Sequence, residues 1–302
     1  MARDIKLDDA PREVPFRAQL AVLFGGVTQQ IGWGFVLFGL LFGWIFGLNS
    51  EALTLIEFRG ELGLTDGAVV AVYETAASEN KRSIYGVRYR YPIGEATHVG
   101  VSYGLSNNFS PGQAVKVQYL VNRPDRSRIE GMRVRRFGAF AIFPMLFPLV
   151  GLGLAIRGLF GGLLVRRLLK IGRLAFGRLV HKAETNTRVN KQTVYKLTFE
   201  FSVPKGAKLF GYREAAEQGA DVYQVHHKTH QTIELEDEPE EPLLFDPDNP
   251  HRAYPIDGLP GQVTVSAAGH IEAPPGLLKG LILPALSMLG LAAFVIALWF
   301  SI

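Results

Sequence analysis

Three long apolar runs interrupt the polar pattern of the chain, at residues 31–48, 137–158 and 280–302. The first carries no charge and would measure about 27 Å as a helix, close to the thickness of the hydrocarbon core of a bilayer. Arginines flank the second run on both sides, and Trp299 lies near the end of the third, where an amphipathic ring suits the membrane interface. A buried core helix is the alternative for each run, but such runs in soluble proteins are usually shorter. We therefore predict three transmembrane helices.

Between the apolar runs, the pattern changes to the alternation that is typical of β-strands. Segments rich in Val, Ile and Tyr, separated by turn residues, occur at 68–72, 84–91, 99–103 and 115–120. Similar segments follow the second run, at 179–183, 194–201, 221–226, 232–235 and 243–255. The predicted fold therefore combines integral membrane α-helical spans with two repeated small all-β modules, antiparallel and barrel- or sandwich-like, at 49–136 and 172–275.

Two further helices are predicted beside the spans. Residues 1–30 contain a polar lead-in and then an apolar stretch, which Thr28, Gln29 and Gln30 separate from the first span. We predict an interfacial helix or a helical extension of the span there. A second interfacial amphipathic helix is predicted at 159–171, where arginine and lysine lie beside leucines.

Small residues and prolines shape the predicted spans. Gly39, Gly43 and Gly47 lie on one helix face, where small residues allow another helix to approach closely. Homodimerisation is one interpretation, and packing against another span of the same chain is the one we favour. Pro144 and Pro148 predict a kink in the second span, because proline breaks the helical hydrogen-bond ladder.

One stretch of 25 residues occurs twice, at 67–91 and 177–201, with an offset of 110 and no gap. Seven positions are identical, where roughly one or two identities are expected by chance. They are Gly67/Gly177, Val70/Val180, Glu74/Glu184, Thr75/Thr185, Asn80/Asn190, Lys81/Lys191 and Tyr85/Tyr195. A glutamate at the end of one strand can face the lysine across a hairpin turn, and asparagine tolerates the turn conformation. The residues that we expect to specify the fold, rather than a shared ligand site, are Glu74, Asn80, Lys81, Tyr85, Glu184, Asn190, Lys191 and Tyr195.

The second copy is longer than the first. Its closing segment aligns at an offset of 126, with Phe245 on Tyr119, which leaves 16 extra residues within 204–241. This insertion has a helix-prone part at 213–218 and an acidic end. If one module has a dedicated ligand, the longer copy is the better place to look for it.

The repeat includes the helix ahead of each module, and this predicts the topology. One span separates the two modules, so they should lie on opposite sides of the bilayer. Four basic residues precede the first span and only Arg59 follows it closely, which favours a cytoplasmic N-terminus. We therefore expect a multi-pass protein of the cell membrane, with the first module extracytoplasmic and with the N-terminus and second module cytoplasmic.

Charge and composition narrow the choice of partners. The net charge of +4 is modest for 302 residues, and the arginines gather at the span boundaries. This placement favours anionic lipid headgroups over nucleic acid. The absence of cysteine excludes disulfides, cysteine zinc sites and a thiol nucleophile. We expect membrane lipid and another membrane protein, or a second copy of the chain, as partners, with no nucleic acid and no cofactor.

Candidate chemistry is sparse. His226, His227 and His230 form an HHxxH cluster, but on a strand His227 would oppose the other two, so the cluster is not a ready zinc triad. His226 and His230 are therefore weak metal candidates. The acidic run at 234–241 lacks the ligand spacing of a calcium loop and is typical of a solvated loop. No serine-nucleophile or nucleotide-binding motif is present, so no catalytic residue is predicted.

The segments ETAASENKRSIYGVRYRYP and RPDRSRIEGMRVRRFG before the second predicted span, and DEPEEPLLFDPDNP after it, resemble a bacterial membrane family catalogued as domain of unknown function 3592. The resemblance covers roughly residues 55–260. It implies a membrane-anchored β-module with no assigned activity, and it transfers no catalytic or binding residue.

Together, these observations favour a non-enzymatic integral membrane protein whose duplicated β-modules mediate protein interaction or stabilise a membrane complex. One alternative is an oligomeric transport or lipid-handling component, because Arg157 lies at the end of the second span, where a charge is a functional suspect. A second alternative is a metal-dependent enzyme at the insertion between His226 and Glu241.

Overall fold

The computed structural model describes residues 5, 7–189, 191–203 and 219–301. It divides into two compact units, which are described separately below. Unit 1 lies within Met1–Gly34 and Gly151–Leu286, and unit 2 within Phe35–Val150 and Ser287–Ile302. The division falls inside three long helices, so each unit contains one β-module and part of each helix.

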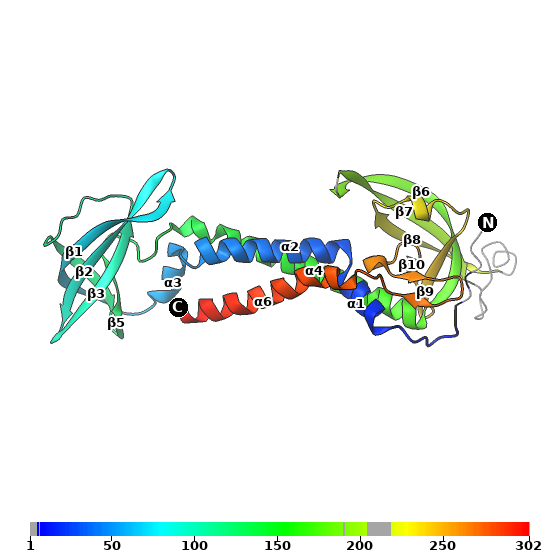
Figure 1. Cartoon of the computed structure of the whole chain (residues 1–302), viewed down its shortest axis with the longest axis horizontal. Helices are drawn as coiled ribbons and strands as arrows, with labels where there is room; N and C mark the ends of the chain where they lie inside the picture. Colours follow the sequence, from blue (N-terminus) through cyan, green and yellow to red (C-terminus); the bar gives the residue numbers. More distant parts are fainter. Residues whose placement is uncertain (1–4, 6, 190, 204–218, 302) are drawn as a thin grey trace. The chain divides into compact units, whose positions relative to one another are not determined.

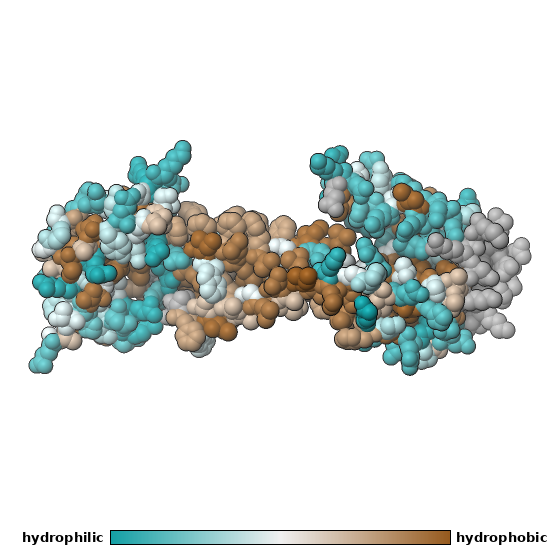
Figure 2. Space-filling view, viewed as in Figure 1, coloured by the Kyte–Doolittle hydropathy of each residue, from teal (hydrophilic) through white to brown (hydrophobic). Residues whose placement is uncertain are grey.

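Three helical segments are long and apolar enough to cross a membrane, at Val27–Gly47, Ala139–Ile171 and Leu277–Phe300. They are built from α2 (Val27–Phe42) with the π-helical η1 (Gly43–Gly47), from the 3-10 segment η3 (Ala139–Met145) with α4 (Leu146–Ile171), and from α6 (Leu277–Ser301). In the second and third, only 17% of the most apolar window is buried, and apolar residues gather over these helices in Figure 2. The three helices are therefore compatible with a multi-pass membrane protein.

The helix that contains the predicted first span begins at Val27, four residues before it. The polar residues at 28–30 are helical, and the break lies at Gly25–Gly26, between α1 (Phe16–Phe24) and α2. The Gln30 side chain explains why this polar position is compatible with a helix. Its Nε2 donates to the carbonyl oxygens of Phe24 and Gly280, each at 2.8 Å. The amide therefore satisfies a carbonyl that the end of α1 leaves without a helical partner.

The second span and the predicted interfacial helix at 159–171 are one continuous helix, α4. Gly162 allows α1 to lie close against this helix, since a Cβ at this position would lie 2.5 Å from the backbone oxygen of Val22. The helical segment changes from 3-10 to α geometry beside the two prolines. Pro144 lies inside the 3-10 segment, and Pro148 lies in the first turn of α4, where proline is tolerated. The proline kink stays a prediction.

Unit 2 contains a five-stranded antiparallel sheet in the order β3-β2-β1-β4-β5 (Figure 1). Its strands are β1 (Leu62–Glu79), β2 (Arg82–Ile93), β3 (Ala96–Gly104), β4 (Ala114–Leu120) and β5 (Arg123–Ile129). The edge strands approach each other, because the Ile129 N–H donates to Ser102 Oγ at 2.8 Å and Tyr103 and Arg133 exchange two backbone hydrogen bonds. The sheet therefore curls around a core that includes Val87, Tyr89, Tyr91 and Val117.

Unit 1 contains a second five-stranded antiparallel sheet in the order β10-β9-β6-β7-β8. Its strands are β6 (Arg173–Val189), β7 (Gln192–Val203), β8 (Asp221–Thr229), β9 (Glu241–Asp246) and β10 (Asn249–Pro255). The predicted strand at 232–235 is wrong, because these residues contain the 3-10 turn η4 (Ile233–Leu235). Leu235 reaches the core from this turn as a single buried anchor. A short hairpin of β11 (Thr264–Val265) and β12 (Ile271–Glu272) follows.

The two sheets have the same strand order when β1–β5 are matched in turn with β6–β10. Their registers also correspond. Glu74 pairs with Tyr85 as Glu184 pairs with Tyr195, which is the offset of 110 seen in the sequence. Tyr119 pairs with Gly63 and Phe245 pairs with Arg173, so the closing strands match at the predicted offset of 126.

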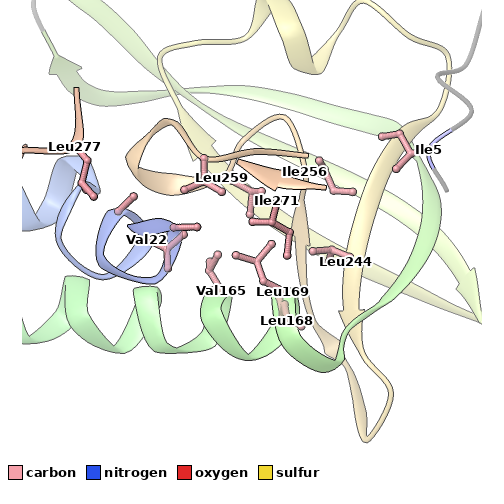
Figure 3. Packing of buried hydrophobic residues seen from close by; sticks show 13 residues of the cluster. Ile5, Val22, Val165, Leu168, Leu169, Leu244, Ile256, Leu259, Ile271 and Leu277 are labelled. Atoms are coloured by element: carbon pink, nitrogen blue, oxygen red, sulfur yellow. The ribbon is translucent and has the colours of Figure 1, made fainter. Parts of the chain in front are cut away.

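Helix α1 contributes one face to the core of unit 1 (Figure 3). Its residues Ala18, Ala21 and Val22 are buried with Leu168 and Leu169 of α4 and with residues of β9 and of the segments after β10. Ahead of α1, the Arg12 guanidinium caps the end of α4 by donating to the carbonyl oxygens of Leu168, Leu169 and Gly172. A cation suits this position because a helix C-terminus carries partial negative charge.

Candidate functional site

The repeated threonine fixes the same bend in the first hairpin of both modules. Thr75 Oγ1 donates to the carbonyl oxygen of Ile84, and Thr185 Oγ1 donates to that of Val194, each at 2.7 Å. Each hydroxyl also accepts from the backbone N–H two residues further on, at 3.3 Å. The strand registers shift directly after Glu74 and Glu184. The threonine therefore holds a β-bulge at the point where each hairpin arm leaves the sheet.

The other repeated residues lie along the same hairpins. The expected pairing of Glu74 with the turn lysine does not occur, since Glu74 lies opposite Tyr85. In the second module, Tyr195 Oη donates to Glu184 Oε1 at 3.4 Å. The turn prediction fits the backbone, because Asn80 and Lys81 have φ angles of 51° and 63°, and Lys191 has a φ of 67°. Positive φ at two successive turn residues is the tight hairpin geometry that asparagine tolerates. Asn190 lies outside the described residues.

Besides the outer strands of each sheet, one inner strand in each module has an open edge over part of its length. β1 pairs with β4 only as far as Ala68, and a loop hydrogen bond extends this to Val69. Within the described residues, no strand pairs with 70–79 on that side. β6 likewise pairs with β9 only as far as Gly177, which leaves 178–189 open. An open edge presents unpaired N–H and C=O groups to which another strand can add.

An exposed valine lies at the start of each free edge. Val70 and Val180 are one of the seven identical pairs of the repeat, and they are 44% and 46% exposed. Each is the extra residue of a bulge, between Val69 and Ala71 in one sheet and between Leu179 and His181 in the other. We did not predict this pair as a site. The sequence signal for this pair was that valine occurs in both copies. Because these valines lie outside the core, packing does not explain why both copies have the same apolar residue.

The glycines of the first span pack within the chain, as the favoured interpretation predicted. A Cβ on Gly39 would lie 2.2 Å from Pro148 Cδ, and one on Gly43 would lie 2.4 Å from the sulfur of Met145. Gly47 faces the same methionine at 3.2 Å. This glycine face is therefore occupied by the start of the second candidate span.

A buried ionic network joins the first sheet to its helices. Glu57, at the end of α3 (Thr54–Glu57), has a side chain that is 1% exposed. Its two carboxylate oxygens accept from Arg126 and from Arg135, the latter at 2.9 Å. Arg135 also donates to the carbonyl oxygen of Leu48 at the end of the first candidate span.

A second glutamate, Glu51, holds the same junction through its backbone. Its Oε2 accepts the backbone N–H groups of residues 134 and 135, at 3.1 and 3.0 Å. The arginine-rich junction is therefore an ordered part of the module. In the sequence, the signal for this network was Glu57, the single acidic residue in the mainly apolar segment 53–58.

A buried carboxylate and a buried imidazole distinguish the second module. Glu241 is 2% exposed, and neither of its carboxylate oxygens makes a hydrogen bond of standard geometry with the described residues. Burial raises its pKa to about 8, with help from Asp257, Asp237 and Glu238, while the backbone N–H of Asp257 opposes the shift in part. Burial lowers the pKa of His227 to about 4. The fold therefore holds a neutral acid and a neutral imidazole at pH 7.

The other histidines do not assemble a metal site within the described residues. The His226 ring lies 3.0 Å from Thr198 Oγ1, and His227 packs edge-on against Tyr254 at 4.9 Å between ring centroids. His230 follows the end of β8. No group of three or more His, Asp or Glu side chains in the described part of the chain is placed to hold a metal ion. Residues 204–218 of the insertion, including the helix-prone part, lie outside the described residues.

Arg157 lies in the middle of α4, which continues beyond the predicted end of the second span to Ile171. Its side chain is exposed, and it makes no ion pair with the described residues. A guanidinium at this position gives the second candidate span one charged side chain in its central part.

Comparison of the chain with known families finds no protein-family model that matches, and comparison with curated proteins finds no match. The resemblance to the bacterial membrane family therefore stays a prediction.

Proposed function

We propose that this chain is a non-enzymatic, multi-pass protein of the cell membrane, and that its two β-modules bind extended segments of partner proteins at the free edges of β1 and β6. The observation that carries this proposal is the recurrence of one arrangement in both modules. Each has an open edge that begins at a bulge with an exposed valine, Val70 or Val180. Backbone groups on an edge supply affinity for an added strand, and a side chain at its start supplies specificity.

The membrane part of the proposal rests on the exposed apolar helices. Leu289 and Trp299 of α6 are 69% and 82% exposed, and Leu149 of α4 is 64% exposed. Exposure of such an apolar surface to water is unfavourable, whereas lipid tails or neighbouring helices would bury it. The shared order and register of the sheets support the interpretation that each module, with its preceding span, is one copy of a repeated unit. Because one predicted span separates the two modules, we expect them on opposite sides of the bilayer. The distribution of basic residues favours the N-terminus and the second module in the cytoplasm.

Lysine substitution at the edge valines tests the binding proposal, because lysine on an edge strand disfavours the addition of another strand. The variants are Val70→Lys and Val180→Lys, each in the full chain purified in mild detergent. Val99→Lys on β3 and Val222→Lys on β8 are the matched controls, since these valines are 60% and 55% exposed but lie on the outer strands of the sheets, away from the open edges of β1 and β6. We expect the unaltered chain to co-purify with a stoichiometric partner or a second copy, and at least one edge variant to lose it.

Two results would contradict this proposal. The first is a clean monomer from the unaltered chain with no partner. The second is equal loss of the partner from the control variants and the edge variants, since this would show that any added charge on the sheets disrupts the complex. The mass of the complex distinguishes a different protein from self-association.

A further inference from the structure

A pocket of about 260 Å³ opens where the first sheet meets its helices. Its lining residues all belong to unit 2 and are Asn49, Glu57, Tyr103, Arg126, Val134, Arg135 and Arg136. Asn49 follows closely on Gly47, where the first candidate span ends, and Arg136 shortly precedes Ala139, where the second begins. Segments that leave one span and enter the next therefore supply part of the pocket wall.

Positive charge exceeds negative charge in this lining, because three guanidinium groups face one carboxylate. Both oxygens of that carboxylate, Glu57, are taken by Arg126 and Arg135. Asp125 also approaches Arg126, at 3.9 Å, but its side chain is 73% exposed and its charge is screened by water. Arg136 is exposed and makes no salt bridge within the described residues; its guanidinium carbon lies 6.0 Å from the centroid of the Tyr103 ring.

We propose that this pocket binds a phosphate group, either the phosphodiester of an anionic membrane lipid or free phosphate. Guanidinium groups bind phosphate oxygens through two parallel hydrogen bonds. Glu57 fixes the orientation of Arg126 before a ligand arrives, so little side-chain entropy is lost on binding. Arg136 supplies the remaining charge. Arginines next to membrane spans lie at the depth of lipid phosphates, which gives the lipid an advantage in local concentration. This inference goes beyond partner binding at the strand edges and depends on other residues.

The test compares two probes on the full chain in detergent. Native mass spectrometry with added phosphatidylglycerol counts the lipid that the protein retains, and isothermal titration with inorganic phosphate measures the free anion. The main variant is Arg136→Gln, since this side chain holds no ion pair on which the described fold depends. Arg59→Gln is the matched control, because Arg59 is also exposed and follows the first span but does not line the pocket.

We expect at least one probe to bind the unaltered chain, and Arg136→Gln to weaken that binding about fivefold or more, as the loss of one guanidinium–phosphate pair implies. Arg59→Gln should leave it unchanged. Binding of the lipid alone assigns the site to a headgroup, and binding of phosphate alone assigns it to the free anion. The proposal is overturned if neither probe binds, or if the two variants weaken binding equally. The edge-valine variants leave this pocket intact, so failure of one proposal does not decide the other.

Discussion

Glu241 makes the second module sensitive to pH in a way that can be calculated. Its pKa of about 8 in the fold, against an ordinary value of 4.5, means that the folded chain holds a proton that the unfolded chain releases. Stability from this group is therefore fully present below pH 4.5 and is lost as the pH rises through 8. At about 1.4 kcal/mol per pH unit, the whole shift corresponds to about 5 kcal/mol.

His227 opposes this trend over part of the range. Its pKa is lowered from 6.5 to about 4, so its contribution is present above pH 6.5 and is lost as the pH falls towards 4. The two effects oppose each other between pH 4.5 and 6.5. Above pH 6.5, of these two groups only Glu241 still titrates, and the module should lose about 2 kcal/mol between pH 6.5 and 8.

Hydrogen exchange at the backbone amides of β9 measures this loss within the module. After correction for the intrinsic pH dependence of exchange, protection in the unaltered chain should fall roughly 30-fold between pH 6.5 and 8. Glu241→Gln keeps the shape of the side chain and removes its charge, so protection should stay level over this range. Glu240→Gln removes the same charge at the neighbouring position and should retain the fall. If protection in the unaltered chain does not change, or if Glu241→Gln shows the same fall, Glu241 is not the buried neutral acid described here.

Three further substitutions test the helices. Arg12→Ala leaves the carbonyl groups at the end of α4 without their cationic donor and should cost about 3 kcal/mol of unfolding free energy; thermal melting should show no comparable effect of Arg17→Ala, whose side chain is exposed. Gly39→Ala should lower the melting temperature because its Cβ would meet Pro148, whereas Gly34→Ala, with nothing within 4 Å, should leave it unchanged or raise it. Arg157→Ala should reduce solute or lipid flux in reconstituted liposomes if the chain is a transport component, and unchanged flux would dismiss that alternative.

The parts of the fold that apolar pattern and turn chemistry determine locally were predictable from the sequence. The three long apolar helices and most strand centres follow from runs and alternation of apolar residues. The strand ends do not. β1 has 18 residues, far beyond the predicted segment, because its outer half forms a hairpin arm in which no residue is fully buried. Such an arm does not need the alternation of apolar and polar residues by which a strand is recognised in the sequence.

The remaining features depend on contacts between residues that are far apart in the sequence, so local patterns could not predict them. In the apolar segment 16–24, Ala18 and Ala21 pack with Leu168 and Leu169 of α4, a contact that no local signal indicates. Glu57 became central only because Arg126 and Arg135, far along the chain, fold back onto it. Val70 and Val180 were visible as an identity in the repeat, but their exposure follows from bulges that depend on the paired strand.

The most direct test of the account is the side of the membrane on which each module lies. The chain has no cysteine, so single cysteines can be introduced at Asn122, in the β4–β5 turn, and at Asn249, at the start of β10. A membrane-impermeant maleimide applied to intact cells should label the Asn122→Cys variant, and should label Asn249→Cys only after the membrane is permeabilised. Equal labelling of both variants in intact cells, or protection of both, would contradict a membrane-spanning chain with one module on each side.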